Sequence, residues 1–251
     1  FAIPSVFAEE TVSPINAPTI QSGGVFTFDD RGIDQWVKQI PLFKKYKAHA
    51  TFFVDHFHTL SPEQIEGLHQ LKAAGHAIGS HSVNHIKAVD YVAAHGMEQY
   101  LKVEIAPSVQ GMSDVGLTPT AFAYPMSSRT NKIDHALLKT FRHLRGGAGL
   151  KPDQAIRDLN TIFTPAQQIA QRHCLIGTGI DYSGTEKRPN SLVQIKAAMD
   201  RAKSRGEIVV FYAHNISDAG PGHHIQPRAL EELLAHAQDI GLPTLSYDEL
   251  P

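Results

Sequence analysis

The stretch VFTFDDR, residues 25–31, joins four residues that suit a buried strand to two adjacent carboxylates. Side chains alternate between faces along an extended chain, so two neighbouring aspartates on a regular strand would point in opposite directions. Asp29 and Asp30 either end the strand at the surface, where they are solvated or cap a turn, or they share a chemical task at the end of a buried strand. Residues elsewhere in the chain decide between these two interpretations.

Short apolar runs alternate with helical patterns from this strand onward. We expect strands at residues 25–28, 50–54, 77–81, 120–124, 144–148, 175–180, 208–213 and 243–246. We expect helices at residues 33–46, 61–75, 95–110, 132–143, from about 164, 191–204 and 227–241, the first interrupted at Pro41. This alternation, with about seven strands, indicates parallel strands joined by crossover helices. The count favours a (β/α) barrel over an open doubly wound sheet.

The composition is that of an ordinary globular protein, with 251 residues of which 42% are hydrophobic and 19% are charged. No linker divides the chain, so we expect one domain over residues 23–251, preceded by an extension over residues 1–22. The net charge of −2 gives no basic surface for a nucleic acid. No run approaches the roughly 18 apolar residues of a membrane-spanning helix.

The first ten residues, FAIPSVFAEE, fit the end of an export signal. Val6, Phe7 and Ala8 before Glu9 would form the cleavage site, which makes residues 1–8 a candidate signal remnant. We therefore expect a secreted or periplasmic protein. The single cysteine, Cys174, excludes an internal disulfide and leaves the compartment undecided.

A pair of histidines, His81 and His85 in HSVNH, ends the expected third strand. If the chain turns helically there, the two imidazoles meet on one face, as ligands of one metal ion do. The alternative, of equal weight for the pair taken alone, is that it caps a loop in a chain with 15 histidines. In a parallel barrel the carboxyl ends of all strands meet at one rim, so the aspartates and histidines converge there. One aspartate and two histidines would leave an open position for water and a second carboxylate to act as a base.

The same rim receives His214, at the end of IVVFYAH, as a candidate proton donor to a leaving group. Asp181, at the end of LIGTGID, is the acidic residue best placed to raise the pKa of this histidine. A histidine that is merely hydrogen-bonded in its loop is the alternative. His223 and His224 in PGHHIQP either line a substrate groove or are exposed loop residues.

Four motifs occur in a particular order, namely TFDD at 27–30, HSVNH at 81–85, FAYP at 122–125 and FYAH at 211–214. In this order and at these separations they resemble the motifs of the polysaccharide deacetylases, carbohydrate esterase family four, which share the nodulation-type deacetylase homology domain. The resemblance covers most of the chain from Gly24 to Leu250. TFDD together with the histidine pair is its specific part, and FAYP alone is weak.

The resemblance implies a distorted, often incomplete (β/α) barrel with the active site at the carboxyl-terminal rim. It implies that Asp29 is the catalytic base and His214 the general acid. Asp30, His81 and His85 are implied to bind one divalent metal ion, usually zinc in such enzymes. The backbone N–H of Tyr124 is implied to hold the oxyanion.

Two departures from the family pattern bear on activity. Family members commonly carry an arginine, which orients the base, two residues before the proline of the third motif, and this chain has Ala123 there. Arg31 and Arg129 are candidates to replace it, although each is more simply a surface charge. The usual Asp-Trp of the fourth motif is absent; Asp181 is the candidate for its acidic member, and the only tryptophan, Trp36, is expected in the core.

These features predict a metal-dependent hydrolase that removes acetyl groups from a glycan, with an N-acetyl amino sugar polymer or oligomer preferred and acetylated xylan also compatible. The expected partner is therefore an acetylated carbohydrate, and the oligomeric state is left open. One alternative is an amidohydrolase acting on a small nitrogen compound. Another is an inactive carbohydrate-binding protein that retains the metal, which the missing arginine allows. A long open groove would favour a polymer, and a closed pocket a small molecule.

Overall fold

Seven parallel strands close into a barrel in the computed structural model, which describes residues 20–151, 154–181, 191–219 and 222–251. The strands of the barrel are β1 (Gly23–Asp30), β2 (Ala50–Val54), β3 (Ala77–Ser80), β4 (Ala121–Ala123), β5 (His143–Gly147), β7 (Cys174–Gly179) and β8 (Glu207–Ala213). They follow one another in sequence order, and β8 closes the barrel by pairing with β1 in parallel. The predicted distorted (β/α) barrel is confirmed. The candidate signal remnant at residues 1–8 lies outside the described residues.

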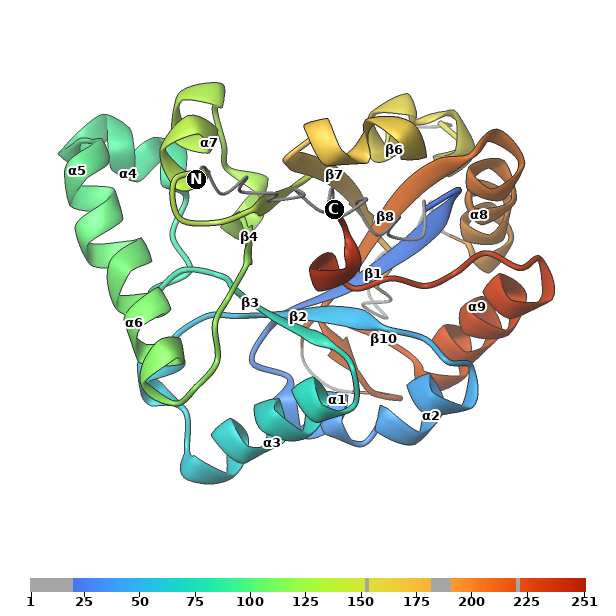
Figure 1. The fold of residues 1–251 in the computed structure, drawn as a ribbon, viewed down its shortest axis with the longest axis horizontal. Helices are drawn as coiled ribbons and strands as arrows, with labels where there is room; N and C mark the ends of the chain where they lie inside the picture. Colours follow the sequence, from blue (N-terminus) through green and yellow to red (C-terminus); the bar gives the residue numbers. More distant parts are fainter. Residues whose placement is uncertain (1–19, 152–153, 182–190, 220–221) are drawn as a thin grey trace, which may run out of the picture.

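Helices lie around the outside of this barrel (Figure 1). They are α1 (Ile33–Val37), α2 (Ile40–Lys45), α3 (Pro62–Ala73), α4 (Ala88–His95), α5 (Met97–Tyr100), α6 (Ala106–Asp114), α7 (Asn131–Leu137), α8 (Leu192–Arg205) and α9 (Pro227–Asp239). The predicted interruption at Pro41 separates α1 from α2. Ser61 and Gln64 form the predicted capping box of α3. None of the helices in the described ranges has the length and apolar character that crossing a membrane requires.

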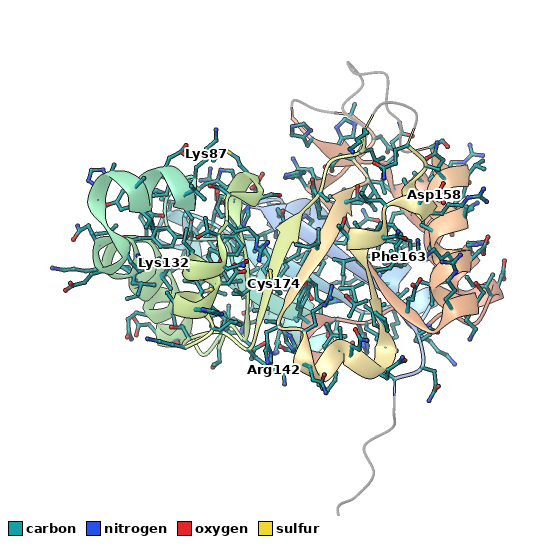
Figure 2. The ribbon with its side chains drawn as sticks, turned by 90° about the horizontal axis from the view of Figure 1, so that it is seen from above. Lys87, Lys132, Arg142, Asp158, Phe163 and Cys174 are labelled. Atoms are coloured by element: carbon teal, nitrogen blue, oxygen red, sulfur yellow. The ribbon has the colours of Figure 1, made fainter. Side chains whose placement is uncertain are left out.

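The predicted helix from about residue 164 is wrong. Residues Phe163–Pro165 form a short strand, β6, which runs antiparallel to β8, and a 3₁₀ helix over Ala166–Gln171 follows it. Phe163 lies on the side of the molecule that carries α8 (Figure 2), where the Arg201 guanidinium stacks on its ring at 3.8 Å. This long-range contact outweighs the local helical pattern. The expected strand at 243–246 reduces to one bridge between Thr244 and Gly24.

The carboxyl-terminal segment closes the amino-terminal end of the barrel. Tyr247 is fully buried; its N–H donates to the Thr51 hydroxyl at 2.8 Å, and its ring packs edge-on against Phe53 and His143. One end of the barrel is filled in this way. The open cavity lies at the other end, where the parallel strands deliver their last residues.

We predict that Gly79→Ala destabilises the barrel, whereas Gly24→Ala is tolerated. A Cβ at Gly79 would lie 3.0 Å from the Ala121 carbonyl oxygen and closer still to the Phe53 ring, whereas a Cβ at Gly24 meets its nearest neighbour at an ordinary 3.5 Å. Overpacking of this kind costs about 1–3 kcal/mol. Chemical denaturation of both variants measures the difference, and equal stability of the two would contradict the packing described here.

Candidate active site

A cavity of about 540 Å³ opens at the carboxyl end of the barrel. It is lined by all the residues to which the sequence assigned a catalytic or metal-binding role, namely Asp29, Asp30, His81, His85, Tyr124, Asp181 and His214. His223 also lines the cavity, with its ring 5.1 Å from that of His214. His224, in contrast, is buried and does not line it.

Backbone conformation explains how two adjacent aspartates both reach this cavity. Asp29 is an inward-facing residue of β1 and is 3% exposed, so regular alternation would turn Asp30 away from the barrel. Asp30, however, has a φ of 79°, in the left-handed region that non-glycine residues rarely adopt. The strand therefore breaks its alternation at its last residue, and both carboxylates line the rim.

Asp30 lies beside the two histidines. Its Oδ1 atom is 3.7 Å from Nε2 of His81 and 3.5 Å from Nε2 of His85. One ligand atom from each of these residues can be chosen so that all three lie within 4.8 Å of one another. The Asp30 Oδ1 atom is buried and has no hydrogen-bond partner among the described residues.

These residues fit a divalent cation. The Nδ1 atom of His81 lies 2.8 Å from the Ala123 carbonyl oxygen, to which it donates, so the other ring nitrogen carries the lone pair that faces Asp30. Burial lowers the pKa of His81 well below its ordinary value, which keeps the ring neutral. Two imidazoles and one carboxylate with an oxygen that has no hydrogen-bond partner among the described residues form a donor set typical of catalytic zinc sites.

Arg145, which the sequence analysis missed, is the cationic partner of Asp29. The two side chains form a buried ion pair between Arg145 Nη2 and Asp29 Oδ2. The candidates proposed from the sequence are wrong, because Arg31 pairs with Asp55 and Arg129 pairs with Asp134. Each of those two arginines is bound to a nearer carboxylate.

The position of Arg145 explains why a linear motif does not find it. Arg145 on β5 is the register partner of Ala123 on β4, and partners on adjacent parallel strands point to the same side of the sheet. The guanidinium thus comes from one strand further round the barrel than the family pattern places it. It stacks on the Tyr212 ring at 4.7 Å, and glycines on β7 leave room for that ring: a Cβ at Gly177 would lie 3.3 Å from it.

The half-buried His214 and the buried Asp181 form a second pair of interacting side chains. The Asp181 carboxylate accepts from the His214 backbone N–H at 2.8 Å and lies 2.7 Å from its Nδ1. Burial alone would lower the pKa of His214, but the hydrogen bond and charge of Asp181, with smaller contributions from Asp29 and Asp30, raise it to about 9. Trp36 packs in the core, as expected, and its indole N–H donates to the His214 carbonyl at 2.9 Å, which fixes the end of β8.

Tyr124 does not have the expected free backbone N–H. This N–H donates to the Arg145 carbonyl at 3.0 Å, continuing the β4–β5 ladder, so the prediction that it holds an oxyanion is wrong. The Tyr124 hydroxyl is also engaged, because it donates to Asp134. Two residues further on, Met126 lines the cavity with a left-handed φ of 51°, and its N–H has no acceptor in the described part of the chain.

Comparison with known proteins relates this geometry to a family. The family model described as polysaccharide deacetylase matches residues 18–160, more than half of the chain. None of the curated proteins compared with the chain matches it.

Several solved structures share the fold. The peptidoglycan deacetylase PdaC from Bacillus subtilis is 17% identical, with a TM-score of 0.55 over 93% of this chain and 91% of that one. A CE4 esterase from Streptococcus mutans is 19% identical, with a TM-score of 0.56 over 91% and 87%. The Xyl-CE4 domain of a multidomain xylanase from the hindgut metagenome of Trinervitermes trinervoides is 15% identical, with a TM-score of 0.54 over 91% and 89%. At these identities the likeness establishes the fold.

We predict that an arginine moved from residue 145 to residue 123 restores the ion pair. Arg145→Ala leaves the buried Asp29 charge unpaired and should cost about 3–5 kcal/mol of unfolding free energy. Combining it with Ala123→Arg should recover at least half of this loss, because the two positions are register partners. Ala123→Arg alone should destabilise, since two guanidinium groups then compete for one carboxylate.

Chemical denaturation measures all three variants, with Arg31→Ala as the control, because Arg31 is exposed and pairs with Asp55. A double variant that is no more stable than Arg145→Ala would show that the two positions do not present their side chains to the same carboxylate.

Proposed function

The chain belongs to the polysaccharide deacetylase family, and from this premise we propose that it is a metal-dependent hydrolase that removes acetyl groups from a glycan. The observation that carries the proposal is the composition of one cavity. Three groups line this cavity. Asp29 is paired with Arg145, and His214 is paired with Asp181. Asp30, His81 and His85 form the candidate metal-ligand set. Hydrolysis of an acetyl group needs a base, an acid and an electrophile in this arrangement.

Asp29 is the proposed base. A divalent ion held by Asp30, His81 and His85 would supply Lewis acidity toward the acetyl carbonyl and lower the pKa of bound water. Asp29 takes a proton from the attacking water through Oδ1, the oxygen that has no hydrogen-bond partner among the described residues. The Arg145 guanidinium holds the other oxygen and so orients the carboxylate.

His214 is the proposed acid. Its Nδ1 is engaged by Asp181, so Nε2 is the atom that delivers a proton to the leaving group. With a pKa of about 9, the imidazole is protonated at neutral pH, as an acid must be before it acts. An amine leaving group needs this proton more than an alcohol does, which favours N-acetyl over O-acetyl substrates.

Met126 takes the oxyanion role that was expected of Tyr124. The proposal rests on its place in the cavity lining, on its N–H, and on its left-handed backbone, which is followed by a second left-handed residue, Ser127. Backbone conformations of this kind cost about 1–3 kcal/mol each and cluster at functional sites. A backbone N–H that faces the developing negative charge would stabilise it without reorganisation.

The shape of the cavity supports a glycan. A second hollow of about 350 Å³ shares Asp30 with the main cavity and is lined by polar side chains, among them Arg31, Thr59, Gln64 and Asn215. The two hollows meet at Asp30, so an oligomer that fills both would extend beyond the acetylated sugar. An N-acetyl amino sugar polymer or oligomer is therefore the proposed substrate class, and secretion to the periplasm or exterior belongs to the same proposal.

The two alternatives are weaker for specific reasons. An inactive carbohydrate-binding protein has no evident need for a base and an acid that are each held by a buried partner. The missing motif arginine no longer indicates inactivity, because Arg145 pairs with Asp29 in its place. A small nitrogen compound would not use the second hollow beyond Asp30.

We predict that the protein releases acetate from N-acetylated glucosamine oligomers, that chelation abolishes the release, and that added zinc restores it. Asp29→Asn should lower the rate roughly 100-fold or more, because a general base contributes at least that much, while the zinc content stays unchanged. His81→Ala should lose the zinc. Acetate assays and metal analysis of the purified variants measure both quantities.

Asp200→Asn is a matched control, since this exposed carboxylate on α8 pairs with His236 and lies outside the catalytic cavity. Acetate release that survives complete chelation would reject the metal-dependent mechanism. No release from glycans but release of ammonia or acetate from small amides would favour the amidohydrolase.

We predict that Asp181→Asn moves the alkaline limb of the pH–rate profile to lower pH. His214 works in its protonated form, so activity persists below its pKa of about 9 and falls as the pH rises through it. Without the Asp181 charge, burial dominates and the pKa falls toward or below its ordinary 6.5. Rates should fall more for N-acetyl than for O-acetyl substrates, and a limb that does not move would show that Asp181 does not set this pKa.

A further inference from the structure

Glu104 is a buried carboxylate that the proposed mechanism does not use. It is 2% exposed and does not line the catalytic cavity. Its Oε2 accepts from the Asn84 backbone N–H at 2.9 Å, and its Oε1 accepts from the Asn84 side-chain amide at 2.6 Å. Among the described residues no lysine or arginine forms an ion pair with it. Burying such a charge is costly unless its hydrogen bonds are complete, so its position requires an explanation.

The explanation lies in the loop that joins the two histidine ligands. Its first and last residues are His81 and His85, and Asn84 directly precedes the second. Ser82 and His85 both have left-handed φ angles, 68° and 53°. Such conformations persist only where the surroundings hold them.

Each backbone N–H of this loop has one acceptor. Those nearer the two ends use other acceptors: His81 donates to the Val54 carbonyl on the adjacent strand β2, Ser82 to Ser80 Oγ and His85 to Ser82 Oγ. The two in the middle both use Glu104: Val83 donates to its carbonyl at 3.1 Å, and Asn84 donates to its carboxylate. Glu104 thus binds the middle of the loop whose two ends carry the histidines.

The helix that carries Glu104 is widened where Glu104 lies. A π-helical turn over Leu101–Ile105 joins α5 to α6, and Pro107 follows two residues later. Proline has no N–H for the carbonyl four residues earlier, and its ring clashes with that carbonyl in a regular α-helix, so the wider turn accommodates it. One turn further on, Ser108 contacts the Ser80 hydroxyl at 2.8 Å, so the same helix supports the loop at a second point.

We propose that Glu104 is a positioning residue that holds the His81–His85 loop in its metal-binding shape by accepting hydrogen bonds from the backbone N–H and the side-chain amide of Asn84. The inference rests on the proposed function in one respect, namely that these histidines bind a divalent ion. Partners that orient metal ligands from outside typically contribute 10–100-fold to metal affinity. The effect here passes through hydrogen bonds to the loop, and the negative charge itself is not required.

Zinc affinity of the metal-free full chain, measured by competition with a chelating dye, tests the proposal independently of turnover. Glu104→Ala should weaken zinc binding about 10–100-fold. Glu104→Gln should bind zinc nearly as the wild type does, because the exposed Asn84 amide can turn over and accept from the new Nε2. Asn84→Asp should weaken binding, since two carboxylates then face each other.

The double variant Glu104→Gln with Asn84→Asp keeps the hydrogen bond from the backbone N–H of residue 84 and re-creates the side-chain bond with donor and acceptor exchanged. Its net charge is unchanged, so it should recover the affinity lost in Asn84→Asp. Glu98→Ala on α5 removes an exposed carboxylate from the same helical segment and serves as the matched control. Far-UV circular dichroism of the metal-free proteins verifies folding; if Glu104→Ala does not fold, Asn84→Asp and the double variant carry the test.

Wild-type affinity in Glu104→Ala would overturn the inference. Equal weakening by Glu104→Gln and Glu104→Ala would also overturn it, because the charge rather than the hydrogen bonds would then be responsible. A wild-type protein that binds no zinc at all would overturn the proposed metal dependence together with this inference, and that result is distinguishable from the other two.

Discussion

The ion pair between Asp29 and Arg145 is the interaction on which the arrangement of the site depends, because both charges lie in the interior of the barrel at 3% and 2% exposure. Removing either partner would leave an uncompensated charge in a medium that solvates it poorly. The pair also dictates its surroundings. Tyr212 stacks on the guanidinium, and a Cβ at Gly177 or Gly179 on the neighbouring strand would lie 3.3 Å or 3.2 Å from its ring. The two glycines of LIGTGI thus give the Tyr212 ring room beside the ion pair.

Several residues at the rim above this pair have strained backbone conformations. Asp30, Ser82, His85 and Met126 are all non-glycine residues with left-handed φ angles, and all lie at the carboxyl ends of strands. At about 1–3 kcal/mol each, these conformations need support from the rigid parts of the fold. That support comes from outside the cavity, as with the Trp36 bond to the end of β8 and the Glu104 bonds to the histidine loop.

Sequence reasoning predicted the barrel and the gathering of the site residues because both follow from periodicity. Alternating strands and helices require parallel strands, and parallel strands deliver Asp29, His81 and His214 to one rim whatever their separation in sequence. The failures share a different cause. The strand at Phe163 is stabilised by a contact with Arg201, and the use of the Tyr124 N–H by the Arg145 carbonyl depends on strand register. Periodicity carries no information on which residue of one strand stands beside which residue of the next.

The arginine of the third motif shows what this limit means for judging activity. A motif states a chemical requirement as a position in the chain, but the requirement itself is a cation at one point in space beside the base. Two positions on adjacent strands, Ala123 and Arg145, face that point, because register partners in a parallel sheet present their side chains to the same side. We therefore expect an arginine to make the same ion pair from either position. The absence of a motif residue in such a barrel is evidence of inactivity only when its register partners on both neighbouring strands lack the charge as well.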